Sequence, residues 1–160
     1  MSYRTFKLYD DDGDLVEVVS SIDSDCLERE TMKVLNRVPL NNVDVIYLLS
    51  LDEILEHFSG DENVYFRLVE EGSVAMNRGC FDYQCYLENG CSVDCQVLRE
   101  LIVPYDHPFY NTELHYEREY LLSLLHELAH ANDLDATEAE AEGWAKDTLF
   151  ELTADGVVEV

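Results

Sequence analysis

The sequence predicts an α+β fold with a mixed, mostly antiparallel sheet. Short runs of alternating and β-branched residues, separated by turn residues, fill the first part of the chain. Two stretches with helical periodicity follow them. A length of 160 residues suits one domain, 1–160, with its own core. We expect 1–104 to form mainly sheet with two helices, and 111–152 to form two further helices.

The N-terminal segment is predicted to start with a hairpin. The pair Asp12-Gly13 interrupts two alternating runs, as a tight turn requires. Ser24 or Asp25 can cap the helix that follows, because a side-chain oxygen there accepts a free backbone N–H. The expected elements are strands at Arg4–Tyr9 and Leu15–Ser20, a helix at 26–36, a strand at Val43–Leu49 and a helix at Asp52–Phe58.

Four more strands are predicted between the break at Ser59-Gly60 and Pro104. The turn signals between them are Glu70-Glu71-Gly72 and Asn89-Gly90, of which the second is typical of a two-residue hairpin. The expected strands are Val64–Val69, Ser73–Met76, Phe81–Leu87 and Ser92–Val103.

The C-terminal part is predicted to contain two consecutive helices. Residues 112–132 contain no Pro or Gly and follow Asn111 and Thr112, either of which can serve as the N-cap. A cluster of turn residues then precedes a second helix at 138–149.

The first of these helices contains the pattern His126-Glu127-x-x-His130. Four residues advance a helix by about 400° and roughly 6 Å, so both imidazoles lie on one face and can reach a single ion. Glu127, beside them, is placed to act as general base. The competing interpretation is an amphipathic helix with two surface histidines. The opposite, apolar face comprises Leu114, Leu121, Leu124, Leu125 and Leu128.

Catalytic zinc usually takes three protein ligands, and the second helix offers candidates for the third. Glu138 lies in the middle of its apolar stripe, Glu142 lies about 40° away, and Glu140 points to the opposite side. Thr137 and Glu140 also form a possible capping box. We therefore rank Glu138 first and Glu142 second as ligands, with the aspartates of Asp133-Leu134-Asp135 third. An Asp135-x-x-Glu138 capping box is the structural alternative for Glu138.

These residues resemble those of the zincin superfamily, in the gluzincin arrangement of one His-Glu-x-x-His helix followed by a glutamate helix. The run Glu138-x-x-Ala141-x-x-Trp144-Ala145 is similar to the pattern of ImmA/IrrE-type zinc endopeptidases. The resemblance implies a zincin-like fold with Zn²⁺ held by His126, His130 and Glu138. It also implies hydrolysis of peptide bonds in a protein or peptide substrate, with Glu127 as general base.

The charge composition indicates the kind of solution in which the protein works. The chain has 35 Asp and Glu against 10 Lys and Arg, a formal net charge of −25. Concentrated salt screens such self-repulsion, because the Debye length falls to about 3 Å at 1 M. We therefore expect a halophilic setting; an acidic mesophilic protein or a binder of basic partners is the alternative. Direct nucleic-acid binding is not expected, because phosphate recognition needs a positive surface.

Targeting and membrane segments are not expected. The N-terminus turns acidic by Asp10 without an apolar segment. The run Val45–Leu49 is far shorter than the ~20 residues needed to cross a bilayer. The expected location is cytoplasmic at high salt, or in association with a virion.

Several residues fit more than one interpretation. Clustered cysteines fit packing, a structural zinc site or disulfides; they are Cys80, Cys85, Cys91 and Cys95. A group that stabilises an oxyanion can come from several side chains, which are His107, Tyr105, Tyr110, Tyr116 and Tyr120. Finally, a zincin-like binding or structural subunit, for instance within a virion or another assembly, and an acidic decoy for DNA-binding proteins are the alternatives to an enzyme.

Overall fold

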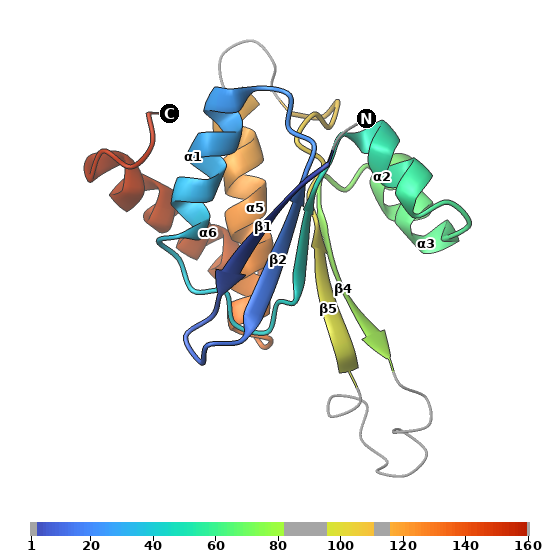
Figure 1. The fold of residues 1–160 in the computed structure, drawn as a ribbon, viewed down its shortest axis with the longest axis horizontal. Helices are drawn as coiled ribbons and strands as arrows, with labels where there is room; N and C mark the ends of the chain where they lie inside the picture. Colours follow the sequence, from blue (N-terminus) through green and yellow to red (C-terminus); the bar gives the residue numbers. More distant parts are fainter. Residues whose placement is uncertain (1–2, 82–95, 111–115, 160) are drawn as a thin grey trace.

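A five-stranded mixed sheet lies at the centre of the computed structural model, which describes residues 3–81, 96–110 and 116–159 (Figure 1). The strand order is β1-β2-β3-β5-β4. The strands are β1 (Arg4–Tyr9), β2 (Leu15–Ser20), β3 (Val45–Leu48), β4 (Met76–Phe81) and β5 (Gln96–Ile102).

The sheet is mixed, as predicted, but it is not mostly antiparallel. The pairs β1–β2 and β4–β5 are antiparallel, whereas β2–β3 and β3–β5 are parallel. Parallel neighbours need a crossover that carries the chain back along the sheet. Helix α1 (Asp25–Leu35) provides this crossover between β2 and β3. Sequence patterns report turns between neighbours in the chain, and they do not report which distant strand β3 and β5 will pair with.

The predicted N-terminal elements are confirmed with small shifts. The first hairpin has the expected strand ends, and Gly13 in its turn has a φ of 85°. Ser24, one of the two candidates, caps α1 by accepting a hydrogen bond from the Leu27 N–H at 3.2 Å. Helix α2 (Leu51–His57) starts one residue earlier than expected because Ser50 caps it.

The predicted strands at Val64–Val69 and Ser73–Met76 are wrong. Residues 62–70 are helical instead, as α3 (Glu62–Tyr65) and a π-helical turn, η1 (Phe66–Glu70). Asp61 begins this helix by accepting the N–H groups of residues 63 and 64. Val64 and Leu68, four residues apart, are buried together, while Tyr65 and Phe66 are exposed. A cap and a one-turn burial period therefore outweigh the β propensity of the aromatic and β-branched residues.

Strand β4 begins at Met76, five residues before the predicted start at Phe81. Met76, its first residue, pairs with Ile102 of β5 and is fully buried. Because Met76 is buried in this contact, the strand begins earlier in the chain than the alternating pattern of the sequence indicated. The expected Asn89-Gly90 turn lies outside the described residues, as do the remainder of that predicted strand and the start of the next.

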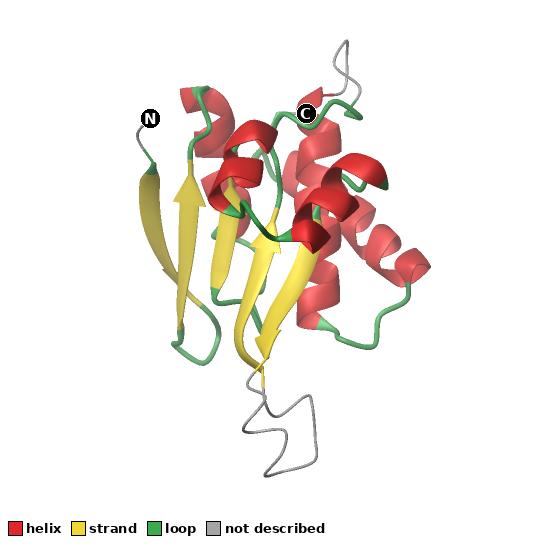
Figure 2. Cartoon of the chain, turned by 90° about the vertical axis from the view of Figure 1, so that its right-hand side faces the viewer, coloured by secondary structure: helices red, strands yellow, loops and turns green. Residues whose placement is uncertain are grey.

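Helices lie on both faces of the sheet (Figure 2), and the buried hydrophobic side chains form two clusters. Alternation along β3 separates them, because successive side chains of a strand point to opposite faces. Ile46 and Leu48 join the larger cluster, with α1, α5 (Tyr116–Asn132) and α6 (Glu138–Ala154). Tyr47 and Leu49 face the smaller cluster, with α2, α3 and η1.

Helices α5 and α6 are the two C-terminal helices that the sequence predicted. The predicted start of α5 at 112–115 and its proposed caps lie outside the described residues. Its C-terminal end is anchored to the loop before β3. The Asn132 amide accepts the Asn41 N–H at 2.8 Å and donates to the Pro39 carbonyl at 2.9 Å. The His130 end of the helix is therefore held against the sheet layer.

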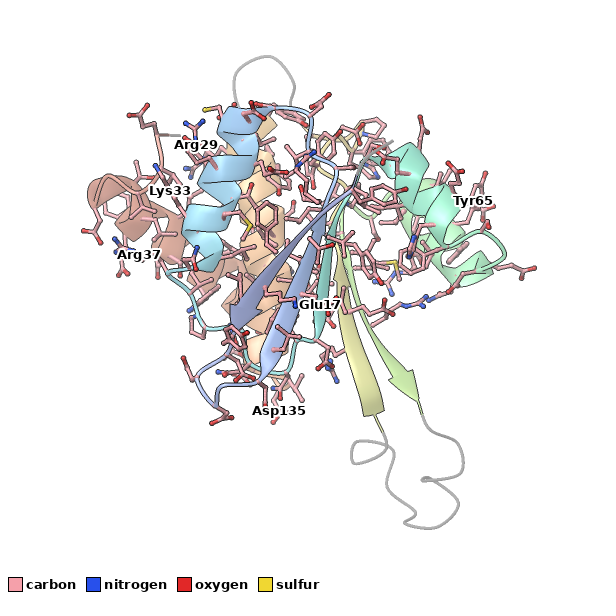
Figure 3. All side chains as sticks on the ribbon, viewed as in Figure 1. Glu17, Arg29, Lys33, Arg37, Tyr65 and Asp135 are labelled. Atoms are coloured by element: carbon pink, nitrogen blue, oxygen red, sulfur yellow. The ribbon has the colours of Figure 1, made fainter. Side chains whose placement is uncertain are left out.

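Basic side chains are few, and three of them gather at one place. Arg29, Lys33 and Arg37 lie along α1 and its C-terminal end (Figure 3). They are exposed and spaced one helical turn apart. This stripe lies on the surface over α1 and is not part of the candidate metal centre.

Candidate metal centre

Helix α5 presents His126 and His130 from one face, as the four-residue spacing predicts. The opposite face anchors the helix, because its leucines are fully buried. The two imidazoles retain 23% and 22% exposure, so they are packed yet reachable from solvent. Their Nε2 atoms lie 3.2 Å apart. The buried residues behind them are Leu121, Leu124, Leu125 and Leu128.

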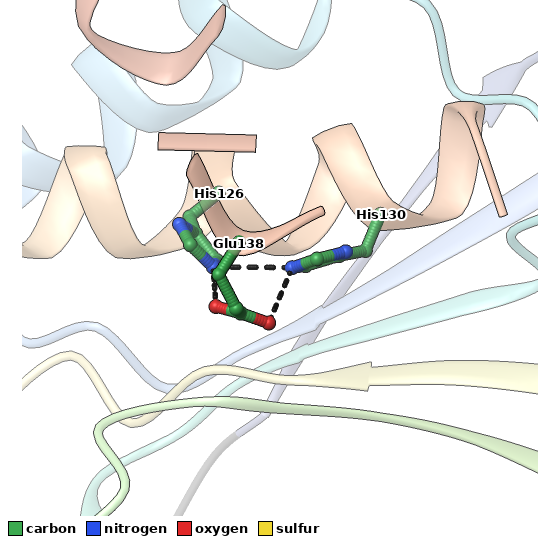
Figure 4. A group of neighbouring side chains, drawn as sticks. All are labelled: His126, His130 and Glu138. Carbon is green, nitrogen blue, oxygen red and sulfur yellow. Dashed lines mark hydrogen bonds and ion pairs between the residues drawn. The ribbon is translucent and has the colours of Figure 1, made fainter. Parts of the chain in front are cut away.

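Glu138, the first residue of α6, reaches both imidazoles (Figure 4). Its Oε2 lies 2.9 Å from Nε2 of His126, and its Oε1 lies 3.0 Å from Nε2 of His130. Thr137 and Glu140 form the predicted capping box of α6, so Glu138 is not needed as a cap. The alternative box starting at Asp135 is thereby excluded. One ligand atom from each of the three residues lies within 4.8 Å of the others.

The spacing of these donor atoms suits a small tetrahedral ion. With zinc bonds of about 2.0–2.1 Å, neighbouring ligand atoms of a tetrahedral site lie about 3.3 Å apart. The two imidazole nitrogens are 3.2 Å apart, and each lies 2.9 or 3.0 Å from a different oxygen of the Glu138 carboxylate. Two imidazole nitrogens and a carboxylate are also the ligand types that zinc takes. The residues therefore fit the metal that the sequence pattern predicts.

Glu127 lies beside this group and has an unusual environment. Burial raises the pKa of its carboxyl to about 7, with His130 and Arg67 acting to lower it and Glu138 acting to raise it further. A carboxylate in this range can accept and return a proton near neutral pH. A cation held by the neighbouring ligands would lower this pKa and favour the ionised, basic form.

A pocket of about 360 Å³ opens beside His126, Glu127 and Glu138. Helices α5 and α6 form one side of it. The opposite side comes from Arg67 of η1 and from Ser73–Ala75, the segment that leads into β4. The edge strand also approaches the motif helix, since the Asn77 amide lies 3.5 Å from the Glu127 carbonyl. The candidate ligands and general base thus lie along a cleft with two walls of different origin.

The other acidic candidates are elsewhere. Glu142 lines the pocket, but its carboxylate pairs with Nζ of Lys146 at 3.1 Å and is not in the converging group. Glu140 accepts the Thr137 N–H at 3.1 Å. Asp133 and Asp135 are exposed in the turn, where Asp133 accepts the Asp135 N–H at 3.1 Å. Among the described residues, Glu138 is the carboxylate that faces both imidazoles.

The proposed oxyanion donors are used for structure instead. The hydroxyl groups of all four tyrosines contact internal oxygens. Tyr105 donates to the Ser21 carbonyl at 3.4 Å, and Tyr110 donates to the Pro104 carbonyl at 3.1 Å. Tyr116 donates to the Tyr105 carbonyl, and the Tyr120 hydroxyl lies 3.2 Å from the Thr31 hydroxyl. Burial raises the pKa of each hydroxyl. His107 is buried, with Nε2 3.0 Å from the Leu68 carbonyl. None of these five side chains lines the described pocket.

Two other groups of potential metal ligands do not indicate a metal site. Asp10, Asp12 and Asp14 come together at the first hairpin, where Asp10 accepts the N–H groups of the other two at 2.9 and 2.8 Å. This is an ordinary aspartate turn. Cys26 is exposed. The predictions for the other cysteines, Cys80, Cys85, Cys91 and Cys95, concern side chains outside the described part of the chain.

Arg67 is a pocket residue that no pattern in the sequence indicates. Arg67 was expected on a strand, and that assignment did not predict that it would lie near the motif helix. Only the composition offered a signal that could have identified it. The chain has 10 Lys and Arg in all, so each basic residue is a candidate for contact with a negatively charged group at a functional site.

Comparison of the chain with protein-family models, with curated proteins and with solved structures finds no match. Within residues 3–81, 96–110 and 116–159, no helix has both the length and the apolar character needed to cross a membrane. The function is therefore inferred from the geometry of the site.

Proposed function

We propose that this chain is a zinc-dependent endopeptidase with a zincin-like fold of the gluzincin type. One observation carries the proposal: donor atoms of His126, His130 and Glu138 converge at zinc-ligand spacing, and Glu127 lies beside them in an open pocket. The sequence resemblance to ImmA/IrrE-type endopeptidases agrees with this ligand set.

The chemistry divides between the metal and Glu127. When bound, zinc supplies a Lewis acid that lowers the pKa of a coordinated water to about 7 and polarises a carbonyl. The Glu127 carboxylate takes a proton from the attacking water and delivers it to the nitrogen of the departing amine. Its partly buried position keeps bulk water from competing for that proton, and His130 favours the ionised form that the first transfer needs.

A protein or peptide substrate fits the exposure of the site. Glu138 is 83% exposed, so the candidate ligands lie at the surface and not at the bottom of a closed cavity. The pocket of about 360 Å³ beside His126 and Glu127 can take up part of an extended peptide segment. The net charge of −25 further supports a high-salt setting for this reaction.

The test combines metal content with proteolysis in molar KCl. Zinc stoichiometry is measured by mass spectrometry, and cleavage of unfolded casein is followed for the wild type and Glu127→Gln. We expect both proteins to bind one zinc and the variant to lose on the order of 10²–10⁴ in kcat.

The opposite results have distinct meanings. Equal cleavage by Glu127→Gln would remove the general-base role. A stoichiometric zinc that survives in a protein with no hydrolytic activity would favour the other prediction, a binding or structural subunit. Absence of zinc binding in both proteins would overturn the metal site itself.

A further inference from the structure

Arg67 and the motif helix lie on opposite sides of the candidate cleft. Arg67 lines the same pocket as His126 and Glu127 but comes from η1, on the wall opposite α5. A guanidinium therefore lies where it can interact with a group bound between the two walls.

The backbone around Arg67 is fixed from several directions. Its carbonyl accepts the Ser73 N–H at 2.8 Å, which turns the following segment back to form the same wall. The next carbonyl, of Leu68, lies 3.0 Å from Nε2 of buried His107. Nδ1 of His107 accepts the Phe109 N–H at 3.2 Å, so the proton of the neutral ring is on Nε2 and is donated to Leu68. These contacts hold η1 at one place.

The helical register here is unusual, and it changes the direction in which side chains project. The Glu71 N–H bonds to the Phe66 carbonyl five residues back, at 2.8 Å. Such π-type turns occur often at functional sites. Gly72, with a φ of 74°, ends the turn, and a Cβ there would lie 2.2 Å from the Phe109 ring. The chain therefore keeps a turn that only glycine accommodates next to Arg67.

The side chain of Arg67 is held much less firmly than its backbone. In the described part of the chain it pairs through Nε with Glu71 at 3.4 Å, and both side chains are about two-fifths exposed, at 41% and 45%. An exposed pair at this spacing contributes little to stability. A guanidinium has five N–H donors, so it can bind a further oxygen.

The other donors that line the pocket are less suited to this task. The hydroxyls of Ser73 and Ser123 carry no charge, and Ser123 donates to the Glu119 carbonyl at 3.0 Å. The four tyrosines and His107 that the sequence suggested all bond to internal oxygens, and one of these bonds, from Tyr110 to the Val74 carbonyl at 3.3 Å, is made to a residue that lines the pocket. Lys146 is on the same wall as the ligand Glu138 and pairs with Glu142. Arg67 is the cation that faces the motif helix from the opposite wall.

We propose that Arg67 is a catalytic residue that donates hydrogen bonds to the carbonyl oxygen of the bond being cleaved. This inference rests on the proposed function. As water adds to the carbonyl carbon, the carbonyl π electrons move onto its oxygen, and the guanidinium stabilises the negative charge that develops there. The charge returns to the carbonyl when the C–N bond breaks and Glu127 protonates the amine. Arg67 itself neither gains nor loses a proton.

The experiment uses the zinc-loaded full chain and a quenched fluorescent peptide built around a casein bond that the wild type cuts. Arg67→Gln, Arg67→Lys and the charge-matched control Arg29→Gln, on α1 and away from the pocket, are compared. We expect Arg67→Gln to keep its zinc and lower kcat on the order of 10²–10³ with little change in KM. Arg67→Lys should recover part of the loss, and Arg29→Gln should match the wild type.

A binding readout independent of turnover uses a peptide in which an anionic phosphoramidate replaces the scissile amide. Calorimetry should show that Arg67→Gln weakens its binding on the order of 10²-fold. In a Glu127→Gln background, which does not cleave, the intact peptide should bind equally with and without Arg67.

Several outcomes would overturn this assignment. Unchanged kcat in Arg67→Gln, alongside an inactive Glu127→Gln, would leave the peptidase intact and remove Arg67 from catalysis. A rise in KM alone, with weaker binding of the intact peptide, would make Arg67 a ground-state binding residue. A zinc-loaded wild type that neither cleaves casein nor binds the phosphoramidate would remove the proposed function and the role of Arg67 together.

Discussion

Thr137 and Glu140 cap helix α6 reciprocally, and this pairing determines which glutamate faces α5. The Thr137 hydroxyl accepts the Glu140 N–H at 3.1 Å, and the Glu140 carboxylate accepts the Thr137 N–H at the same distance. Since this box begins the helix at Glu138, the carboxylate of that first residue is left to meet the two imidazoles.

Glu138→Ala is expected to weaken zinc binding by several orders of magnitude, because two imidazoles alone remain. Competition with a chelator of known affinity measures the effect. Glu140→Ala is the matched control: it should keep the zinc affinity and lower the free energy of unfolding by about 1 kcal/mol through loss of the box. Loss of zinc in Glu142→Ala, with Glu138→Ala unaffected, would place the ligand one turn later.

Salt dependence of stability follows from the 35 acidic residues and 10 basic ones. At 0.01 M ionic strength the Debye length is about 30 Å, so carboxylates repel one another across the whole domain, whereas at 1 M it is about 3 Å. We expect the melting temperature, followed by circular dichroism, to fall steeply between molar and 0.01 M KCl. Sucrose at equal osmolality should not restore it. A constant melting temperature would contradict the halophilic interpretation.

Acid sensitivity is expected at the start of α3. A hydrogen bond from Arg78 holds the pKa of Asp61 below its ordinary value, and burial acts in the opposite direction. A carboxyl with a lowered folded-state pKa contributes stability that is present above its unfolded-state pKa of about 3.9 and is lost as the pH falls through the folded-state value. Asp61 therefore stabilises the fold near pH 6 but not in strong acid.

Asp61→Asn isolates this charge effect, because asparagine can still cap the helix. The difference in free energy of unfolding between wild type and variant should be positive near pH 6 and shrink as the pH falls below about 4. Urea unfolding at a series of pH values provides the measurement. A difference that stays constant in acid would show that the ion pair with Arg78 contributes nothing.

Local signals in the sequence predicted most of the elements correctly. The first hairpin, α1 and the two C-terminal helices depend on turns, caps and periodicity within single segments. Val64–Val69 was misread because its aromatic and β-branched residues favour a strand, while the Asp61 cap and the joint burial of Val64 and Leu68 favour a helix. The parallel pairing of β3 depends on contacts between distant segments, which no local pattern records.

The residues of the candidate site divide in the same way, into those that local patterns predict and those that depend on contacts between distant segments. His126, Glu127 and His130 share one helix, so their relation follows from helix geometry alone. Glu138 could be ranked first because helical periodicity places it in the middle of the apolar stripe of its helix, whereas Glu140 points to the opposite side. Arg67 could not be found, since its place opposite α5 depends on a π-type turn, on His107 and on the path of the chain around the edge of the sheet.

The two hydrophobic clusters give the cleft a modular construction. Helices α5 and α6 pack on the larger cluster, whereas Leu68, next to Arg67, packs on the smaller one across the sheet. Val74 and Ala75, from the same wall as Arg67, contact the larger cluster. Substitutions in η1 can therefore change the Arg67 part of the cleft while the packing behind the histidine pair is kept, whereas substitutions at Val74 or Ala75 disturb both.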